Sequence, residues 1–298
     1  MSHKQSDILD TMTKPRVSLV LPAYNEAAHL RACLDAIFAQ TVQPYEVIVV
    51  DNNSTDETAA IARSYAGVRV LSEKRQGVVF ARNRGFDAAR GDIIGRIDAD
   101  TIIEPTWIAS LQKIFEEDES LAAVSGRMHY YDVALSGLVD ACDGYFRRAL
   151  ARQLMEQDLV FLQGANMGMR RTSWRHVREH VCGSGGFHED FDLAIHLQEL
   201  GLEVRYDDRL RAGISARRTD VGFLSFLNYV HMSPHTYAIH GKNRIHKIYG
   251  VSGLALIAYL PARLLHRGYD PRTERFSLKR VFTLRSISRP NPASHSMR

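Results

Sequence analysis

Short apolar runs alternate with longer amphipathic stretches through the first hundred residues, and this alternation restricts the fold more than any other feature of the chain. The stretch after the first run places apolar side chains at helical spacing, on Leu30, Cys33, Leu34, Ile37 and Phe38. Strands and helices joined by connections this short form a parallel sheet with helices on its faces. The sequence therefore predicts an α/β fold, with a Rossmann-like, mostly parallel sheet flanked by helices. The predicted strands are residues 17–21, 46–50, 68–71 and 92–97, and the predicted helices are residues 26–40, 55–65 and 77–90.

The second half of the chain is less regular, but helical and extended segments still alternate in it. Gly201 is expected to end one of its helices, because glycine tolerates the left-handed conformation at a helix C-terminus. Helices are predicted at residues 105–117, 132–156 and 190–200 and from residue 223 onward, and strands at residues 121–126, 159–162, 166–170, 202–206 and 212–216.

The number and spacing of the cysteines and the hydropathy of the chain indicate its cellular compartment. The three cysteines show no Cys-x-x-Cys spacing and cannot form a disulfide framework, which favours a reducing, cytoplasmic environment. The polar N-terminus lacks the apolar core of a signal peptide. No run of about 20 apolar residues is present for a transmembrane helix, and the nearest candidate, residues 251–265, is interrupted by Pro261.

Positive charge is concentrated at the C-terminal end. Residues 262–298 hold nine Lys and Arg against Asp270 and Glu274, although the whole chain has a net charge of only +4. A basic segment next to a short apolar stretch suits peripheral contact with an anionic membrane, and a solvated tail is the alternative. We expect no nucleic-acid partner, because no binding motif accompanies the charge.

Acidic segments follow the predicted strands, and ligands of such sheets bind beyond the carboxyl ends of the strands. Residues two apart in an extended chain point to the same side, so Asp98 and Asp100 can face one divalent metal ion shared with a diphosphate. A surface turn is the alternative. Asp51 follows another strand and can accept hydrogen bonds from a nucleobase or a ribose, with ordinary turn chemistry as its alternative.

Several segments in this order resemble the motifs of family 2 glycosyltransferases, which have the GT-A fold. They are Val20-Leu21-Pro22-Ala23-Tyr24-Asn25-Glu26, Val49-Val50-Asp51-Asn52-Asn53-Ser54-Thr55-Asp56, Gly77-Val78-Val79-Phe80-Ala81-Arg82-Asn83-Arg84-Gly85, Asp98-Ala99-Asp100-Thr101 and Gly186-Phe187-His188-Glu189-Asp190-Phe191-Asp192-Leu193.

The resemblance implies an inverting transfer of a sugar from a nucleotide sugar, usually a UDP-sugar, to an acceptor hydroxyl. It implies a GT-A catalytic domain at residues 16–218, between a polar tail at residues 1–15 and a helical, basic extension at residues 219–298. It also implies Mn²⁺ or Mg²⁺ as cofactor, bound by Asp98 and Asp100. The implied nucleotide-sugar-binding residues are Pro22, Tyr24, Glu26, Asp51, Gly77, Arg82, Asp98 and Asp100.

Asp190 is the candidate catalytic base by the same resemblance, with Glu189 second, while Asp192 is assigned to the helix surface. One carboxylate within hydrogen-bond reach of the acceptor hydroxyl suffices to accept its proton. The alternative for Glu189 and Asp190 is ordinary acidic charge at the start of a helix, where it is stabilising.

The roles of three further groups of residues are left open by the sequence. Residues 163–166 are a candidate wall of the donor-sugar pocket or a plain turn, and Arg217 and Arg218 are either phosphate ligands or a surface pair. Among the late histidines, His231 and His235 have zinc-compatible spacing, but no third ligand is evident and a structural zinc site is not expected there. One late histidine joining the metal ion at Asp98 and Asp100 is a further possibility.

The leading hypothesis is a metal-dependent glycosyltransferase of the hexosyltransferase type that adds one sugar to a glycan, glycolipid or lipid-linked acceptor of the cell envelope. It would act in the cytoplasm, at the inner face of the membrane. Transfer to polyprenyl phosphate and a non-catalytic protein that binds nucleotide sugar or glycan are the alternatives. Nucleotidyl transferases and NAD-dependent enzymes are disfavoured, because no glycine-rich phosphate loop follows the first strand.

Overall fold

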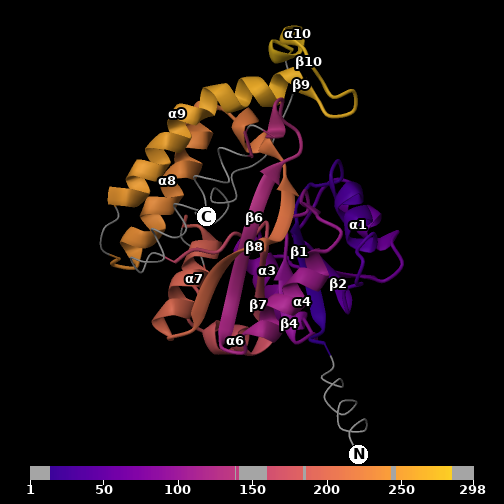
Figure 1. Ribbon diagram of the computed structural model, residues 1–298, viewed down its shortest axis with the longest axis vertical. Helices are drawn as coiled ribbons and strands as arrows, with labels where there is room; N and C mark the ends of the chain where they lie inside the picture. The colour runs from indigo at the N-terminus through magenta and orange to yellow at the C-terminus, as the bar shows by residue number, and fades with distance from the viewer. Residues whose placement is uncertain (1–13, 138, 141–159, 184–185, 243–245, 284–298) are drawn as a thin grey trace, which may run out of the picture.

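The computed structural model describes residues 14–137, 139–140, 160–183, 186–242 and 246–283, and its arrangement is shown in Figure 1. One large sheet runs through the protein, with strand order β3-β2-β1-β4-β7-β6-β8-β5. Its strands are β1 (Val17–Ala23), β2 (Glu46–Asp51), β3 (Val68–Ser72), β4 (Ile93–Arg96), β5 (Ile102–Ile103), β6 (Leu121–Tyr130), β7 (Met167–Arg170) and β8 (Glu203–Ile214).

The sheet is mostly parallel, as predicted. β1 pairs in parallel with β2 and β4, and β2 with β3. β7 is antiparallel to both β4 and β6, whereas β6 and β8 are parallel to each other. In the β4–β7 pair, Arg96 lies opposite Met167. The segment that leads into β7 therefore lies at the carboxyl end of β4.

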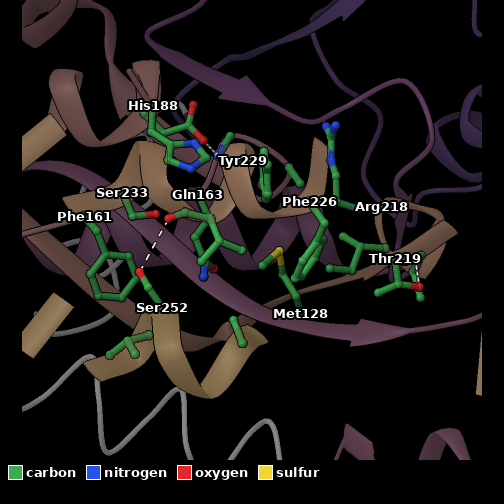
Figure 2. A pocket seen from close by; sticks show the side chains of 18 of the residues that line it. Met128, Phe161, Gln163, His188, Arg218, Thr219, Phe226, Tyr229, Ser233 and Ser252 are labelled. Atoms are coloured by element: carbon green, nitrogen blue, oxygen red, sulfur yellow. Dashed lines mark hydrogen bonds between the residues drawn. The ribbon is translucent and has the colours of Figure 1, made fainter. Parts of the chain in front are cut away.

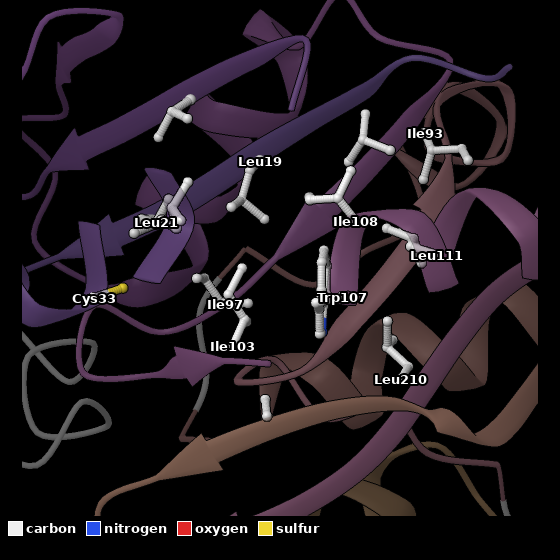
Figure 3. Close-up of a cluster of buried hydrophobic side chains, with 14 of the residues drawn as sticks. Leu19, Leu21, Cys33, Ile93, Ile97, Ile103, Trp107, Ile108, Leu111 and Leu210 are labelled. Atoms are coloured by element: carbon white, nitrogen blue, oxygen red, sulfur yellow. The ribbon is translucent and has the colours of Figure 1, made fainter. Parts of the chain in front are cut away.

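Helices cover both faces because the strands are apolar on both faces. Leu19 and Leu21 of β1 pack into a cluster with α1 and α4, and Figure 3 shows Trp107 of α4 near the centre of it. Val20, between them, faces the opposite side and packs with α3, α6 and α7. These helices are α1 (Leu30–Phe38), α2 (Thr58–Arg63), α3 (Val78–Ala88), α4 (Trp107–Glu117), α6 (Arg171–Val177) and α7 (Glu189–Glu199).

A helical unit follows the sheet. The 3-10 helix η1 (Ala216–Asp220) leads into α8 (Phe223–Ile239) and α9 (His246–Gly268), which pack side by side at the edge of the molecule away from α1 (Figure 1). The Tyr259 hydroxyl of α9 donates a 2.7 Å hydrogen bond to the Val221 carbonyl. A small hairpin, β9 (Tyr269–Asp270) with β10 (Arg275–Phe276), and α10 (Leu278–Val281) end the described chain.

Most of the predicted elements are present in the predicted order, but β5, α6, η1 and the β9–β10 hairpin are not among the predictions, and other details differ. Residues 160–162 are not a strand, because β6 already has β7 and β8 as neighbours on its two sides. The strands predicted at residues 202–206 and 212–216 are one strand, β8. The helix predicted at residues 26–40 begins at Leu30, because the backbone before it bonds to side chains that include Thr58. Most of the helix predicted at residues 132–156 lies outside the described residues.

Candidate functional site

A buried guanidinium, that of Arg96, lies at the centre of the acidic groups. Arg96 ends β4 and is 2% exposed. Its Nη2 donates to Glu189 Oε1 at 2.8 Å and to Asp98 Oδ1 at 3.3 Å, and its Nη1 forms an ion pair with Asp190. The fold thus brings the carboxyl end of β4 against the first turn of α7, and one cation holds three carboxylates together.

Sequence reasoning missed Arg96, which it read as part of an apolar strand. The signal was present, because a charged residue inside a run such as Ile93-Ile94-Gly95-Arg96-Ile97 is unusual. Charged side chains are almost never fully buried unless they are paired. An arginine at the buried end of a strand therefore indicates acidic partners from elsewhere in the chain.

Gly164 fixes Asp190 from the other side. Its backbone N–H donates a 2.7 Å hydrogen bond to Asp190 Oδ2. A Cβ atom at Gly164 would lie 1.8 Å from Arg96 Nη1, so only glycine allows the guanidinium to approach this backbone. Gly164 is therefore part of the acidic site, although residues 164 and 165 also form a turn.

The two adjacent carboxylates of α7 differ in acidity. Burial raises the pKa of Asp190, but the Arg96 guanidinium and the hydrogen bonds from Glu189 and the Gly164 N–H together outweigh burial, and the net pKa is lowered. The pKa of Glu189 is raised, first by burial and then by the neighbouring charge of Asp190. Asp190 is thus the group that stays ionised at neutral pH.

A second ion-pair network joins Glu26 to Asp100. Arg217 Nη2 donates to both oxygens of Glu26, at 2.6 and 2.7 Å, and its Nε donates to Asp100 Oδ2 at 2.7 Å. Arg217 is therefore a partly buried bridge between two predicted donor-site residues, not a freely exposed surface arginine. The two networks meet at the loop of Asp98 and Asp100, which is a turn and not the extended segment expected from the sequence.

A cavity of about 510 Å³ opens beside both networks (Figure 2). Asp98, Asp100 and Asp190 are among the residues that line it. Figure 2 shows Gln163 and His188 along the same cavity, with Arg218 farther along it. The other wall is formed by apolar and aromatic side chains of α8 and α9, among them Phe226, Tyr229, Val230, Tyr237, Val251, Ala255 and Tyr259.

The remaining predicted donor residues lie outside this cavity. Pro22 and Asp51 lie near the carboxyl ends of β1 and β2, paired in register with Val50 and Ala23 respectively. Asp51 Oδ1 accepts a 3.2 Å bond from the Ser54 N–H, as in a turn. Tyr24 and Gly77 are not among the lining residues either.

Arg82 occupies a different place from the one the resemblance implies. It is fully buried beneath the start of α7, where its Nη1 donates to the Glu189 carbonyl at 2.6 Å. Its guanidinium lies 5.9 Å from the ring centre of Trp174. In this structure Arg82 supports the backbone that carries Glu189 and does not line the cavity.

The assignment of Asp192 to the helix surface is wrong. The residue is 0% exposed, because the segment at Cys182 and the end of α8 cover that side of α7. The possibility that a late histidine joins the Asp98 and Asp100 site finds no support: among the described residues, no late histidine groups with these two as potential metal ligands. His240 lies against Asp192 instead.

Comparison with known proteins gives a family match over much of the chain. Residues 18–178 match the family model described as glycosyl transferase family 2. The matched region contains β1 to β7 and ends before α7.

Individual relatives match over shorter regions. The glycosyltransferase AglE of Haloferax volcanii is 40% identical over 105 residues, which are 33% of this chain and 34% of the relative. A chondroitin synthase of Pasteurella multocida is 35% identical over 114 residues, 37% of this chain and 12% of the relative. The matched region thus spans about a third of the length of the first relative and about an eighth of the second.

One solved structure is similar over most of the chain. It is the mannosyltransferase PcManGT from Pyrobaculum calidifontis, in complex with GDP-Man and Mn²⁺. The TM-score is 0.58 at 19% identity, with 85% of this chain and 75% of that chain covered. At this identity the likeness concerns the fold.

Replacing Gly164 by alanine is expected to lower the free energy of unfolding by about 1–3 kcal/mol, because the new methyl group overlaps the fixed Arg96 guanidinium. Denaturant unfolding measures this loss. Gly250→Ala in α9, where a Cβ meets nothing within 4 Å, is the matched control. Equal stability of the two variants would contradict the close approach.

His188 is expected to make stability pH-dependent. Burial lowers the pKa of His188 to about 4, so the unfolded chain binds this proton first as the pH falls. The neutral imidazole of His188 therefore costs no stability above pH ~6.5, and the free energy of unfolding falls as the pH drops from ~6.5 toward ~4. At pH ~5 the loss is at most about 2 kcal/mol. Unfolding of the wild type and of His188→Gln at pH 7.5 and 5 tests this: the variant should lose less. An equal loss of stability in the wild type and in His188→Gln would contradict this role of His188.

Proposed function

The chain belongs to glycosyl transferase family 2 and has the GT-A fold, and we propose that it catalyses the inverting transfer of a sugar from a nucleotide sugar to an acceptor hydroxyl. One observation supports this most: Asp190 is held ionised by Arg96 and Gly164 at the wall of a cavity that Asp98 and Asp100 also line. A base and a pair of metal-binding carboxylates thus border one space.

Asp190 is the proposed base. Arg96 and the Gly164 N–H hold one oxygen each, and a carboxylate oxygen has a second lone pair that can accept the acceptor hydroxyl. Fixing both oxygens orients the carboxylate before substrate binds, which lowers the cost of reaching a reactive geometry. Glu189, with its raised pKa and its bond to Arg96, is proposed as a positioning residue.

The donor is proposed to lie along the carboxyl ends of β1, β2 and β4. Asp98 and Asp100 fit a hard divalent cation, because both are carboxylates and both line the cavity. Mn²⁺ or Mg²⁺ bound there would neutralise charge that develops on the departing diphosphate. Arg217 holds Asp100 and Glu26 together and keeps this end of the site ordered. Pro22, Tyr24, Asp51 and Gly77 remain proposed donor contacts.

The acceptor is proposed to enter between α8 and α9. Aromatic and apolar side chains form that wall of the cavity, and Ser233, Ser252 and Gln163 add polar groups (Figure 2). Such a mixed wall suits a sugar attached to an apolar carrier. We therefore propose a glycolipid or lipid-linked glycan of the cell envelope as the acceptor class.

A membrane-facing surface is proposed on α9 and α10, consistent with a cytoplasmic enzyme bound peripherally. Leu254, Ile257, Leu260 and Leu264 form one stripe of α9 and are exposed, Ile257 at 76%. Phe282 just after α10 is 83% exposed, and the nearby Arg272, Arg275 and Lys279 are also exposed. Apolar side chains beside cations are what an anionic membrane surface recognises.

Peripheral binding fits α9 better than spanning. Its 23 residues meet the length and composition of a membrane-crossing helix, and only 11% of its apolar window is buried. Its other side, however, packs on α8 and η1, and it ends in His266 and Arg267, which pair with Asp220. A helix held in this way presents one face to a membrane.

Asp190→Asn is expected to reduce sugar transfer by about 10²–10⁴-fold, because it removes the proton acceptor. Binding of UDP with Mn²⁺, measured by calorimetry with GDP as comparison, should remain close to wild type. Glu116→Gln, an exposed carboxylate on α4, is the matched control. The absence of nucleotide binding in the presence of metal would contradict the donor site.

The same variant separates the two enzymatic alternatives. A polyprenyl-phosphate acceptor has no hydroxyl proton to lose, so activity of Asp190→Asn near the wild-type level would favour that reaction. Slow, metal-stimulated hydrolysis of a UDP-sugar by the wild type would exclude the non-catalytic alternative.

Ile257→Asp combined with Leu260→Asp is expected to weaken binding to phosphatidylglycerol-containing vesicles at least tenfold, since burying each such side chain contributes about 1.5–3 kcal/mol. Vesicle sedimentation measures this, with phosphatidylcholine vesicles for comparison. Leu200→Asp, exposed at the end of α7, should bind as the wild type does. Equal binding by all three proteins would refute the membrane-facing surface.

A further inference from the structure

Four potential metal ligands meet where α7 contacts the end of α8 and the segment at Cys182. They are Cys182, Asp192, His196 and His240, and one ligand atom from each lies within 4.8 Å of the others. Asp192 and His196 come from α7, His240 caps the C-terminus of α8, and Cys182 lies in the segment before α7. We propose that these four residues form a structural zinc site, separate from the Asp98 and Asp100 carboxylates.

The distances match a tetrahedral site. Bonds of about 2.0–2.3 Å place neighbouring ligand atoms of tetrahedral zinc about 3.2–3.8 Å apart. Asp192 Oδ1 lies 3.0 Å from His240 Nε2 and 3.4 Å from His196 Nε2. Cys182 Sγ lies 3.9 Å from His196 Nε2. The widest separation among the four ligand atoms is up to 4.8 Å, so a zinc ion at the centre would draw that pair together by about 1 Å.

The types of the four ligand atoms indicate which metal ion would bind. One thiolate, two imidazoles and one carboxylate are the groups that bind Zn²⁺, whereas Mg²⁺ and Mn²⁺ prefer oxygen. Four protein ligands leave no open position, which is typical of a structural rather than a catalytic zinc site.

The surroundings support a metal site as well. His196 Nδ1 lies 3.1 Å from Glu199 Oε2, so a carboxylate orients the imidazole whose other nitrogen faces the cluster. Lys242 pairs with the second oxygen of Glu199 at 3.1 Å. The Cys182 N–H donates to Asp192 Oδ2 at 3.1 Å, which orients that carboxylate.

The proposed zinc site would affect the proposed catalytic base through the backbone of α7. It joins the segment at Cys182 and the end of α8 to the helix whose first turn carries Glu189 and Asp190. His188, just before this turn, already donates its N–H to Thr236 of α8 at 2.9 Å. Zinc would therefore fasten α7 to α8 at a second point and fix the position of the proposed base.

The experiment is metal analysis of the full-length protein purified in zinc-containing medium without chelator. We expect about one zinc per chain, lost from Cys182→Ser and from His240→Ala. His231→Ala, on the exposed side of the same helix, should retain the metal. Chelation should lower the melting temperature of the wild type, and zinc should restore it.

Cobalt substitution tests the ligands directly. Co²⁺ in the wild type and in His231→Ala should give a thiolate-to-cobalt charge-transfer band, which Cys182→Ser should lack. Asp98→Asn should keep this band, because Asp98 is not one of the four proposed zinc ligands and the thiolate that gives the band is that of Cys182. Failure here is therefore distinct from failure of the proposed transferase activity. Folded wild-type protein that has neither stoichiometric zinc nor the cobalt band would overturn the proposal.

Discussion

The burial of one positive charge organises the functional half of this protein. A guanidinium at the end of a central strand, removed from water, is strongly unfavourable unless its partners surround it. Arg96 acquires three carboxylate partners, of which Glu189 and Asp190 are almost a hundred residues away along the chain. Satisfying Arg96 therefore requires α7 to dock with its first turn against β4, and that docking positions the proposed base.

Sheet topology makes the docking possible. β7 runs antiparallel between β4 and β6, so the chain entering β7 passes the carboxyl end of β4 instead of the opposite edge. Gly164 lies on that entering segment and contacts both Arg96 and Asp190. A fully parallel sheet would place this backbone at the other edge, and the cluster would lose a hydrogen-bond donor and its tight packing.

The helical unit completes a space that the sheet alone leaves open. α8 and α9 supply an apolar wall opposite the carboxylates, and Arg217 of η1 reaches back to Glu26 and Asp100. The same α7 helix presents Glu189 and Asp190 to the transfer site and Asp192 and His196 to the proposed zinc site. The position of one helix thus couples the proposed chemistry to the contacts that stabilise the C-terminal helices.

The sequence by itself determined the alternation of strands and helices, the mostly parallel sheet, the family, and the Asp98, Asp100 and Asp190 carboxylates that share one cavity. These follow from local periodicity and from short motifs, which depend on near neighbours in the chain. Only the tertiary structure decided the role of Arg96 as partner of those carboxylates, the burial of Arg82 and Asp192, and the meeting of Cys182 with His240. Burial and ion pairing depend on segments that are distant in sequence, so no local pattern records which charge meets which.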